Sequence, residues 1–284
     1  MSLLLRGADA AAAMNKKTAQ IVRGLRERGI VPALAVVRVG AREDDLSYER
    51  SAMKRCAALG IETRSVVLPE SAPEDELEQA LLALGADESV DGILPLRPFP
   101  AHMDAERILR ALPPEKDVDG VTAASLAAVY AGTDGGFAPC TAQAVLELLD
   151  YYRVPVEGKR AAVLGRSLTV GRPAAMLLLR RGATVTLCHS KTPDAAAIGG
   201  EADILIVCTG RRESVGAAYF RAGQTVVDVG IHYKEETGSL CGDVVFAEAE
   251  SIVSAVTPVP GGVGALTTAV LAQHTARAAQ RRRK

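Results

Sequence analysis

Hydrophobic and polar positions between residues 8 and 96 follow two periods in turn. Apolar residues that recur every three to four positions predict amphipathic helices, and short continuous apolar runs predict buried strands. Helix and strand alternate regularly, which favours right-handed βαβ units around a parallel sheet. The predicted helices cover residues 8–29, 48–60 and 72–87, and the predicted strands cover residues 32–40, 62–69 and 90–96.

A second α/β series follows residues 115–141, a segment that is rich in glycine and proline and has little periodicity. We expect this segment to form the surface connection between two domains. The series after it contains a helix at 142–152, a strand–glycine turn–helix–strand pattern at 159–190, strands at 202–210 and 224–231, and a terminal helix at 265–283.

The pattern therefore predicts a two-domain α/β protein. We expect residues 1–140 to form an N-terminal α/β domain, with residues 265–284 packing back onto it, and residues 141–264 to form a Rossmann-type domain.

Composition narrows the class of protein. The 284 residues are 48% hydrophobic and carry a net charge of −1, which gives no reason to expect nucleic acid or membrane as a partner. The terminal run from Arg281 to Lys284 is better explained as a solvated helix end than as a nucleic-acid tail. Five cysteines without a CxxC pair favour a reducing compartment and argue against a metal site. No apolar run spans a bilayer and no cleavable signal opens the chain, so we expect a cytoplasmic protein.

The turn "VLGRSLTVGRP" follows a predicted strand and opens a helix, a layout that directs backbone N–H groups at a phosphate. Its spacing is not G-x-G-x-x-G. The next strand ends in His189, Ser190 and Lys191, where NAD-binding domains usually carry a carboxylate. Arg166 and Ser190 suit a 2′-phosphate, which a carboxylate would repel. From spacing alone, an ordinary βα turn with solvated basic residues explains the segment about as well.

Two loops carry further candidate chemistry. The loop "PEKDVDG", residues 114–120, holds two aspartates, and Asx hydrogen bonds in a turn explain at most one of them. The glycines of "TPVPGGVGALTT", residues 257–268, allow close approach to a ligand, although a glycine-rich linker would read the same way. Cys140 is better explained as a packed thiol than as a nucleophile.

In "LSYERSAMKRC", residues 46–56, the position one helical turn after Tyr48 is Ala52. Lys54 lies roughly 120° around the helix from Tyr48, whereas Ala52 lies only about 40° away. Arg55 is nearly on the Tyr48 face but roughly 10 Å further along the axis.

Together these segments resemble the bifunctional methylenetetrahydrofolate dehydrogenase/methenyltetrahydrofolate cyclohydrolase family. The resemblance runs from about residue 3 to about residue 272 and keeps the family's order of motifs. These are "VDGIL" followed by P-x-P, "KDVDG", "PCT", "GRSxxVGxP", "TVTLCHSKT", "ADILIVxTG", "VVDVGI", "GDV" and "TPVPGGVG".

The resemblance implies a homodimer in which residues 1–140 form the folate-binding catalytic domain and residues 141–264 bind NADP. Tyr48 and Asp119 are then the candidate catalytic residues, with Tyr48 bordering the folate and Asp119 hydrogen-bonding the pterin of methylenetetrahydrofolate. Pro260 and Gly261 would line the folate side. The residues expected to hold the dinucleotide are Gly165, Arg166, Ser167, Ser190 and Ile231.

Two positions depart from the family pattern. Ala52 stands where the family has its catalytic lysine, and Lys54 matches a second lysine of the pattern. The family's strand "GILVQLPLP" reads "GILPLRPFP" in this chain, so that Leu96 replaces the glutamine that partners the lysine.

These departures should affect the two reactions of the family differently. Hydride transfer mainly requires positioning, whereas hydrolysis of the methenyl product requires proton transfer. We therefore predict an NADP-dependent dehydrogenase whose cyclohydrolase activity is weak or lost. The alternatives are a full bifunctional enzyme with Arg55 or Lys54 as surrogate base, a dehydrogenase acting on a different pterin, and a non-catalytic folate-binding regulatory protein.

Overall fold

The computed structural model describes residues 2–236 and 238–283. It divides into two compact units, and each unit is formed by two separate segments of the chain. The first unit contains residues 13–140 and the chain from residue 268 onward, and the second contains residues up to 12 together with 141–267. The predicted fold class, a two-domain α/β protein with parallel sheets, is confirmed.

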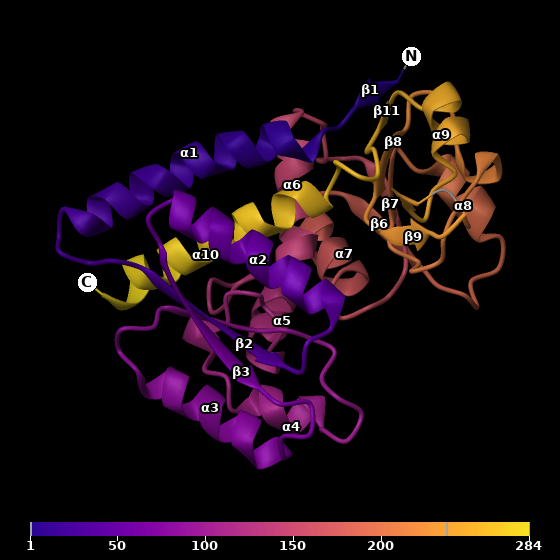
Figure 1. Ribbon diagram of the computed structural model, residues 1–284. Coiled ribbons are helices and arrows are strands. Elements are labelled where there is room, and N and C mark those ends of the chain that lie inside the picture. Colours follow the sequence, from indigo (N-terminus) through magenta and orange to yellow (C-terminus); the bar gives the residue numbers. More distant parts are fainter. Residues whose placement is uncertain (1, 237, 284) are drawn as a thin grey trace. The chain divides into compact units, whose positions relative to one another are not determined.

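The first unit is built on a three-stranded parallel sheet. Its central strand β2 (Ala33–Val39) lies between β3 (Glu62–Leu68) and β4 (Gly92–Pro95), and the buried, mostly apolar run of β2 reflects cover on both faces. Helices α3 (Glu74–Ala86) and α4 (Ala105–Arg110) pack on one face (Figure 1). The other helices of this unit are α1 (Gly7–Arg26, from residue 13), α2 (Glu43–Ala58), α5 (Ala123–Ala131) and α10 (Gly264–Arg282, from residue 268), with a short 3₁₀ turn, η1 (Pro114–Lys116).

The second unit contains a six-stranded sheet in which every neighbouring pair is parallel. The strand order reverses around β5, since β6 lies on one side of it and β7, β8, β11 and β1 follow on the other. The strands are β1 (Leu3–Leu4), β5 (Arg160–Leu164), β6 (Thr184–Cys188), β7 (Ile204–Val207), β8 (Thr225–Asp228) and β11 (Ala255–Val256).

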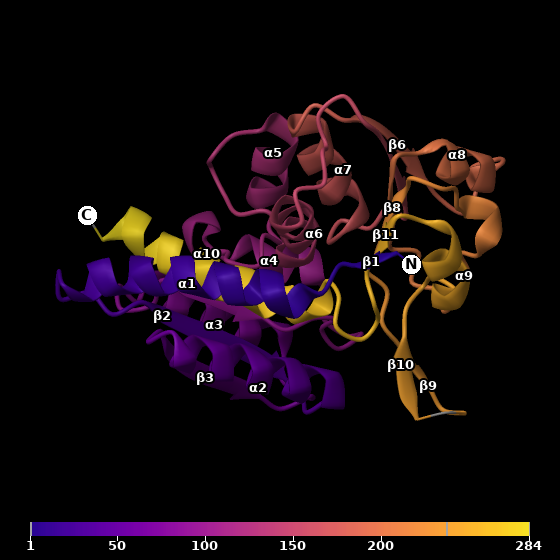
Figure 2. The ribbon, with the colours of Figure 1, turned by 90° about the horizontal axis from the view of Figure 1, so that it is seen from above.

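Helices cover both faces of this sheet, as the Rossmann-type pattern predicts (Figure 1). A two-stranded antiparallel hairpin extends from it (Figure 2). The helices are α6 (Cys140–Tyr151), α7 (Gly171–Arg180), α8 (Ala195–Glu201), α9 (Phe246–Ile252) and the 3₁₀ turn η2 (Ala217–Tyr219), and the hairpin strands are β9 (His232–Lys234) and β10 (Ser239–Cys241).

Two expectations about the chain differ from the structure. Residues 2–12 do not belong to the first unit, because β1 pairs with β11 at the edge of the six-stranded sheet. The segment 115–141 is not an irregular connection, because it contains helix α5. The Thr122 hydroxyl accepts a hydrogen bond from Ser125 N at the start of α5, and Gly132 ends it in a left-handed conformation.

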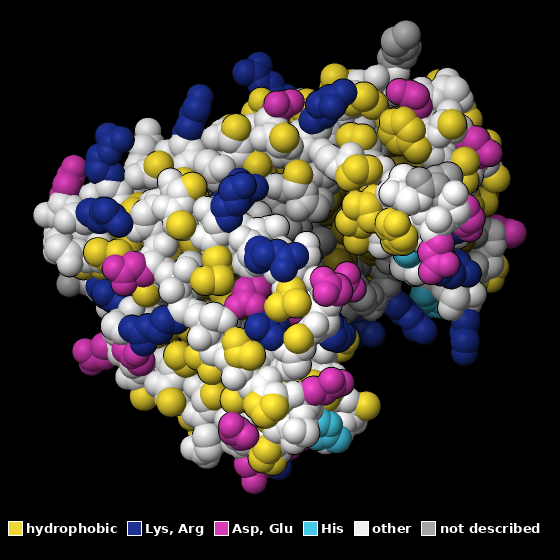
Figure 3. All heavy atoms as spheres, viewed as in Figure 1, with side chains coloured by type: hydrophobic (Ala, Val, Ile, Leu, Met, Phe, Trp, Pro, Cys, Tyr) yellow, Lys and Arg dark blue, Asp and Glu magenta, His cyan; other side chains and the backbone are white. Residues whose placement is uncertain are grey.

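The surface charges are mixed. On the face shown in Figure 3, Lys and Arg side chains are interspersed with Asp and Glu side chains. None of the described helices has the length and apolar character that crossing a membrane requires.

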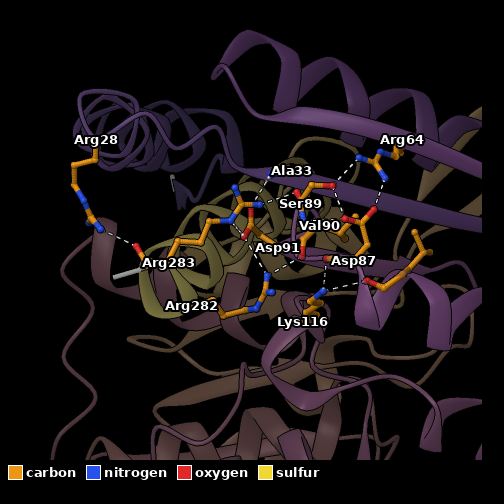
Figure 4. A network of polar contacts seen from close by, with 11 residues as sticks. Arg28, Ala33, Arg64, Asp87, Ser89, Val90, Asp91, Lys116, Arg282 and Arg283 are labelled. Atoms are coloured by element: carbon orange, nitrogen blue, oxygen red, sulfur yellow. Dashed lines mark hydrogen bonds and ion pairs between the residues drawn. The ribbon is translucent and has the colours of Figure 1, made fainter.

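The end of α10 is held by a buried carboxylate (Figure 4). Asp91 is fully buried, accepts a hydrogen bond from Ala33 N at 3.0 Å, and lies 3.1 Å from Arg282 Nη1 and 2.8 Å from Arg283 Nε. Arg282 also donates to the carbonyl of Val90. The prediction of a solvated basic run was therefore wrong for these two arginines; Lys284 lies outside the described residues.

We expect Arg282→Ala/Arg283→Ala to lower the free energy of unfolding by about 3 kcal/mol, because it leaves the buried Asp91 carboxylate without a cation. Urea titration of the first unit's transition measures the loss. Adding Asp91→Asn to the double variant should recover part of the lost stability, since the neutral amide leaves no buried charge without a partner. A double variant as stable as the parent would contradict this role.

Candidate active site

A cavity of about 340 Å³ lies in the second unit at the carboxyl ends of β5, β6 and β7. This is the point where the strand order reverses, and ligands of open α/β sheets bind at such switch points. None of the described residues that line it is acidic. Its lining includes Gly165, Arg166, Ser167, His189, Ser190, Thr209, Arg211 and Tyr219.

The first βα turn is held close to the sheet by glycine. Gly165 has φ +127°, and a Cβ atom there would lie 2.1 Å from the carbonyl oxygen of Cys208. A Cβ on Gly171, the first residue of α7, would lie 2.0 Å from the carbonyl oxygen of Gly165. Only glycine allows this approach, so the turn brings the start of α7 directly against the end of β5.

The structure brings most of the predicted dinucleotide residues together. Gly165, Arg166, Ser167 and Ser190 all line the cavity, whereas Ile231 does not and is 62% exposed. The Ser167 hydroxyl accepts hydrogen bonds from Val170 N at 3.1 Å and Gly171 N at 3.3 Å, so it also orders the turn.

Sequence reasoning missed Arg211, a second arginine at the cavity wall. The signal was present, because the strand "ADILIVCTG" ends directly before Arg211 and carboxyl ends of parallel strands meet at one edge.

Two buried carboxylates order the neighbouring loops of the second unit. Asp228, the last residue of β8, accepts hydrogen bonds from Gly230 N, Asp243 N and Val244 N. Asp243 accepts from Gly210 N and lies 2.7 Å from His232 Nε2. Burial raises the pKa of Asp228 to about 6, although the backbone hydrogen bonds to its carboxylate act to lower that pKa. These contacts explain why the motifs "VVDVGI" and "GDV" contain aspartate.

In the first unit, the two aspartates of 114–120 have different surroundings. Asp117 is buried and accepts hydrogen bonds from Val121 N, from Thr122 N and Oγ1, and from Ser125 Oγ. It is the carboxylate that the turn itself requires. Asp119 is mostly buried, but its side chain is 21% exposed, which leaves it accessible to a ligand.

Asp119 lies beside the end of β4, because residue 117 pairs with Ile93 in a parallel bridge. Its Oδ2 atom is 3.7 Å from Arg97 Nη2. Burial raises the pKa of Asp119 to about 6; Arg97 opposes this shift and the charge of Asp117 adds to it. Sequence reasoning missed Arg97.

Helix α2 contains Tyr48 and the residues that were compared with the family's lysine pattern. Tyr48 is half-buried, and Ala52, one turn later, is fully buried. Lys54 is exposed. Arg55 Nε donates to Thr268 Oγ1 of α10 at 2.8 Å, and burial lowers the pKa of its guanidinium.

The remaining predicted positions are described within their own units. Leu96 is buried directly after β4, where its N–H donates to the carbonyl of Val37 at 2.8 Å. Pro260 and Gly261 are exposed in a turn of the second unit, and Gly261 accepts a hydrogen bond from Gly7 N. Their role beside a folate stays a prediction.

Cys140 is a packed thiol. Its Sγ donates to the carbonyl of Val118 at 3.3 Å, and burial raises the pKa of the thiol. His274 Nδ1 is 3.8 Å away but lies 2.9 Å from the same carbonyl. Since a carbonyl only accepts hydrogen bonds, Nδ1 carries its proton and is no base for the cysteine.

The parallel sheet, its glycine turn and the cavity at its switch point define a two-domain α/β protein with a dinucleotide-binding domain. Comparison with known proteins agrees. Residues 139–283 match the model of the tetrahydrofolate dehydrogenase/cyclohydrolase NAD(P)-binding domain, and residues 5–119 match that of the catalytic domain. The chain belongs to the tetrahydrofolate dehydrogenase/cyclohydrolase family, which confirms the family and the dinucleotide cofactor predicted from the sequence.

Similar proteins align along the whole chain. The bifunctional protein FolD of Carboxydothermus hydrogenoformans is 46% identical over 99% of this chain and 98% of its own. The crystal structure of the bifunctional enzyme FolD from Campylobacter jejuni matches with a TM-score of 0.96 and 37% identity, covering 99% of this chain and 100% of that one. The Trypanosoma brucei enzyme complexed with NADP and inhibitor matches with a TM-score of 0.93 and 34% identity, covering 99% and 98%.

Proposed function

We propose that this protein oxidises methylenetetrahydrofolate to methenyltetrahydrofolate with NADP as hydride acceptor, and that its hydrolysis of the product is weak or absent. Family membership along the whole chain supports the first part. One observation carries the second: the position one turn after Tyr48 holds a fully buried alanine, while Lys54 is exposed.

The residues at the cavity of the second unit fit a phosphorylated dinucleotide. The glycine turn leaves room for a pyrophosphate at the start of α7. Arg166, Ser190 and Arg211 supply donors for a 2′-phosphate, and no acidic residue among the described lining opposes it. When bound, NADP supplies the hydride acceptor, and the chain positions and shields the reacting carbon.

The two reactions need different groups. Hydride loss from the methylene carbon leaves a cation and moves no proton, so Tyr48 and Asp119 need only hold the pterin in place. Hydrolysis adds water to that cation, and a base must take the water's proton while a ring nitrogen is protonated. A general acid–base group contributes about 10²–10⁴-fold to such a step. Neither Ala52 nor Leu96 can transfer a proton.

A second candidate function is the full bifunctional activity, which the names of the similar FolD proteins favour. It requires a surrogate base. Arg55 is a poor one, because a guanidinium stays protonated and its Nε is already bonded to Thr268.

A single assay separates the candidates. The protein is incubated with methylenetetrahydrofolate and NADP, and NADPH formation is followed separately from methenyltetrahydrofolate decay. NADPH formation with only spontaneous decay supports our proposal. Accelerated decay supports the bifunctional enzyme. Folate binding without NADPH formation supports a non-catalytic regulatory protein.

We expect Arg166→Ala to remove most of the preference for NADP over NAD. A charge-assisted contact to the 2′-phosphate contributes about 1.5–3 kcal/mol, or about 10- to 150-fold in kcat/KM for NADP. Turnover with NAD should change little, which serves as the internal control. Equal kcat/KM for NAD and NADP in the parent protein would refute the assignment.

The expected homodimer and the cytoplasmic location stay predictions. Sedimentation of the purified protein tests the first, and fractionation of cells tests the second.

A further inference from the structure

Arg97 follows strand β4 and points its guanidinium at Asp119. The closest atoms, Arg97 Nη2 and Asp119 Oδ2, are 3.7 Å apart, and the two side chains are 25% and 21% exposed. The Nε–H of Arg97 is buried and has no hydrogen-bond partner among the described residues.

This arrangement is poorly suited to stabilising the fold. At 3.7 Å the two groups attract each other but do not form a hydrogen bond, whose N···O distance is about 2.7–3.2 Å. Partly exposed ion pairs contribute little to stability, and a buried donor without an acceptor is unfavourable. The unpaired Nε–H of Arg97, beside a carboxylate that is not hydrogen-bonded to this guanidinium, therefore points to a ligand that pairs with both groups.

The pair presents an acceptor next to a donor. A reduced pterin carries the complementary sequence along one edge: the 2-amino group and N3–H donate, and the adjacent 4-oxo oxygen accepts. A carboxylate alone satisfies the donors and leaves the oxygen unpaired. A guanidinium beside it supplies the missing donor.

We propose that Arg97 is a specificity residue of the folate site, where it donates to the 4-oxo oxygen while Asp119 accepts from the neighbouring N–H groups. This inference rests on the proposed function, because it takes its ligand from there. Arg97 stands where the family pattern "GILVQLPLP" has leucine.

Calorimetric titration with tetrahydrofolate and with its 4-amino counterpart tests the contact. Arg97→Leu should weaken tetrahydrofolate binding about 10- to 150-fold, the range of a charge-assisted hydrogen bond. It should also reduce the preference for the 4-oxo over the 4-amino ligand, which offers a donor in place of the acceptor. Arg97→Lys should retain part of both. The matched control Arg50→Leu, which removes an exposed cation of α2, should leave both unchanged.

A purely structural role predicts a different result: equal loss for both ligands together with a lower melting temperature. That result, or parental binding by Arg97→Leu, overturns the proposal. If Arg97→Leu does not fold, Arg97→Gln takes its place, because its amide is polar but uncharged.

The outcomes for the two proposals are distinguishable. NADPH formation by the parent with an unchanged 4-oxo preference in the Arg97 variants refutes the role of Arg97 alone. An Arg97-dependent preference without NADPH formation refutes the proposed reaction alone. A parent that does not bind tetrahydrofolate refutes both.

Discussion

Ala52→Lys combined with Leu96→Gln is expected to raise the rate of methenyltetrahydrofolate hydrolysis about 10²–10⁴-fold above that of the parent. The reason lies in the burial of position 52. An ammonium group placed there is poorly solvated, which lowers its pKa toward neutrality and makes a neutral amine available to accept a proton.

The two substitutions should act as one unit. Ala52→Lys alone places its amine in a site where the apolar Leu96 side chain gives it no hydrogen bond. Leu96→Gln alone adds an amide with no amine to orient. The double variant should therefore exceed the sum of the two single gains. The measurement is the decay of methenyltetrahydrofolate in all four proteins, corrected for spontaneous hydrolysis.

Two controls limit the interpretation. NADPH formation should change much less than hydrolysis, because hydride transfer uses no base. The melting temperature reports the cost of fitting a longer side chain into a buried position, which is typically about 1–3 kcal/mol. A parent that already hydrolyses the methenyl compound efficiently would refute the hypothesis that Ala52 abolishes hydrolysis. Arg55 or Lys54 would then be the candidate base.

The strands that the sequence predicted are those whose apolar runs are long enough to form a pattern. Residues 32–40 and 202–210 were expected to be strands, and β2 and β7 lie within them. Strands β1 and β11 have two residues each and exist only through their pairing, so no period could reveal them. Helix α5 was not predicted, because its many alanines leave no clear polar face to give a helical period. Thr122 and Gly132, a good N-cap residue and a good C-cap residue, did mark its ends.

The candidate site was predictable only as far as its residues lie in local motifs. The cavity of the second unit is built around one βα turn, so its glycine and Arg166 could be placed from the pattern. The contact between Arg97 and Asp119 depends on the bridge between Ile93 and Asp117, which joins distant parts of the chain. The sequence showed that Leu96 stands where the family pattern has glutamine, but it did not show that the next residue, Arg97, lies beside Asp119.

Asp119→Ala is expected to weaken tetrahydrofolate binding about 10- to 150-fold and to slow hydride transfer, because a carboxylate that accepts hydrogen bonds from a pterin contributes about 1.5–3 kcal/mol. The matched control is Glu115→Gln, which removes an exposed carboxylate from the same segment of the chain. Normal binding by the alanine variant would remove Asp119 from the site.

The pH dependence of binding gives the sharper test. Asp119 presents two acceptor oxygens and a negative charge to the pterin N–H groups only when it is ionised, and its pKa is raised to about 6 in the free protein. Affinity should therefore be constant well above pH 6 and fall as the pH drops through about 6, approaching a tenfold loss for each further unit. Asp119→Asn should bind weakly without this acid limb. In Arg97→Leu the limb should move to higher pH, because the guanidinium that opposes the shift is gone. Calorimetric titrations between about pH 5 and about pH 8 measure all three, and an acid limb that persists in Asp119→Asn would assign the titration to another group.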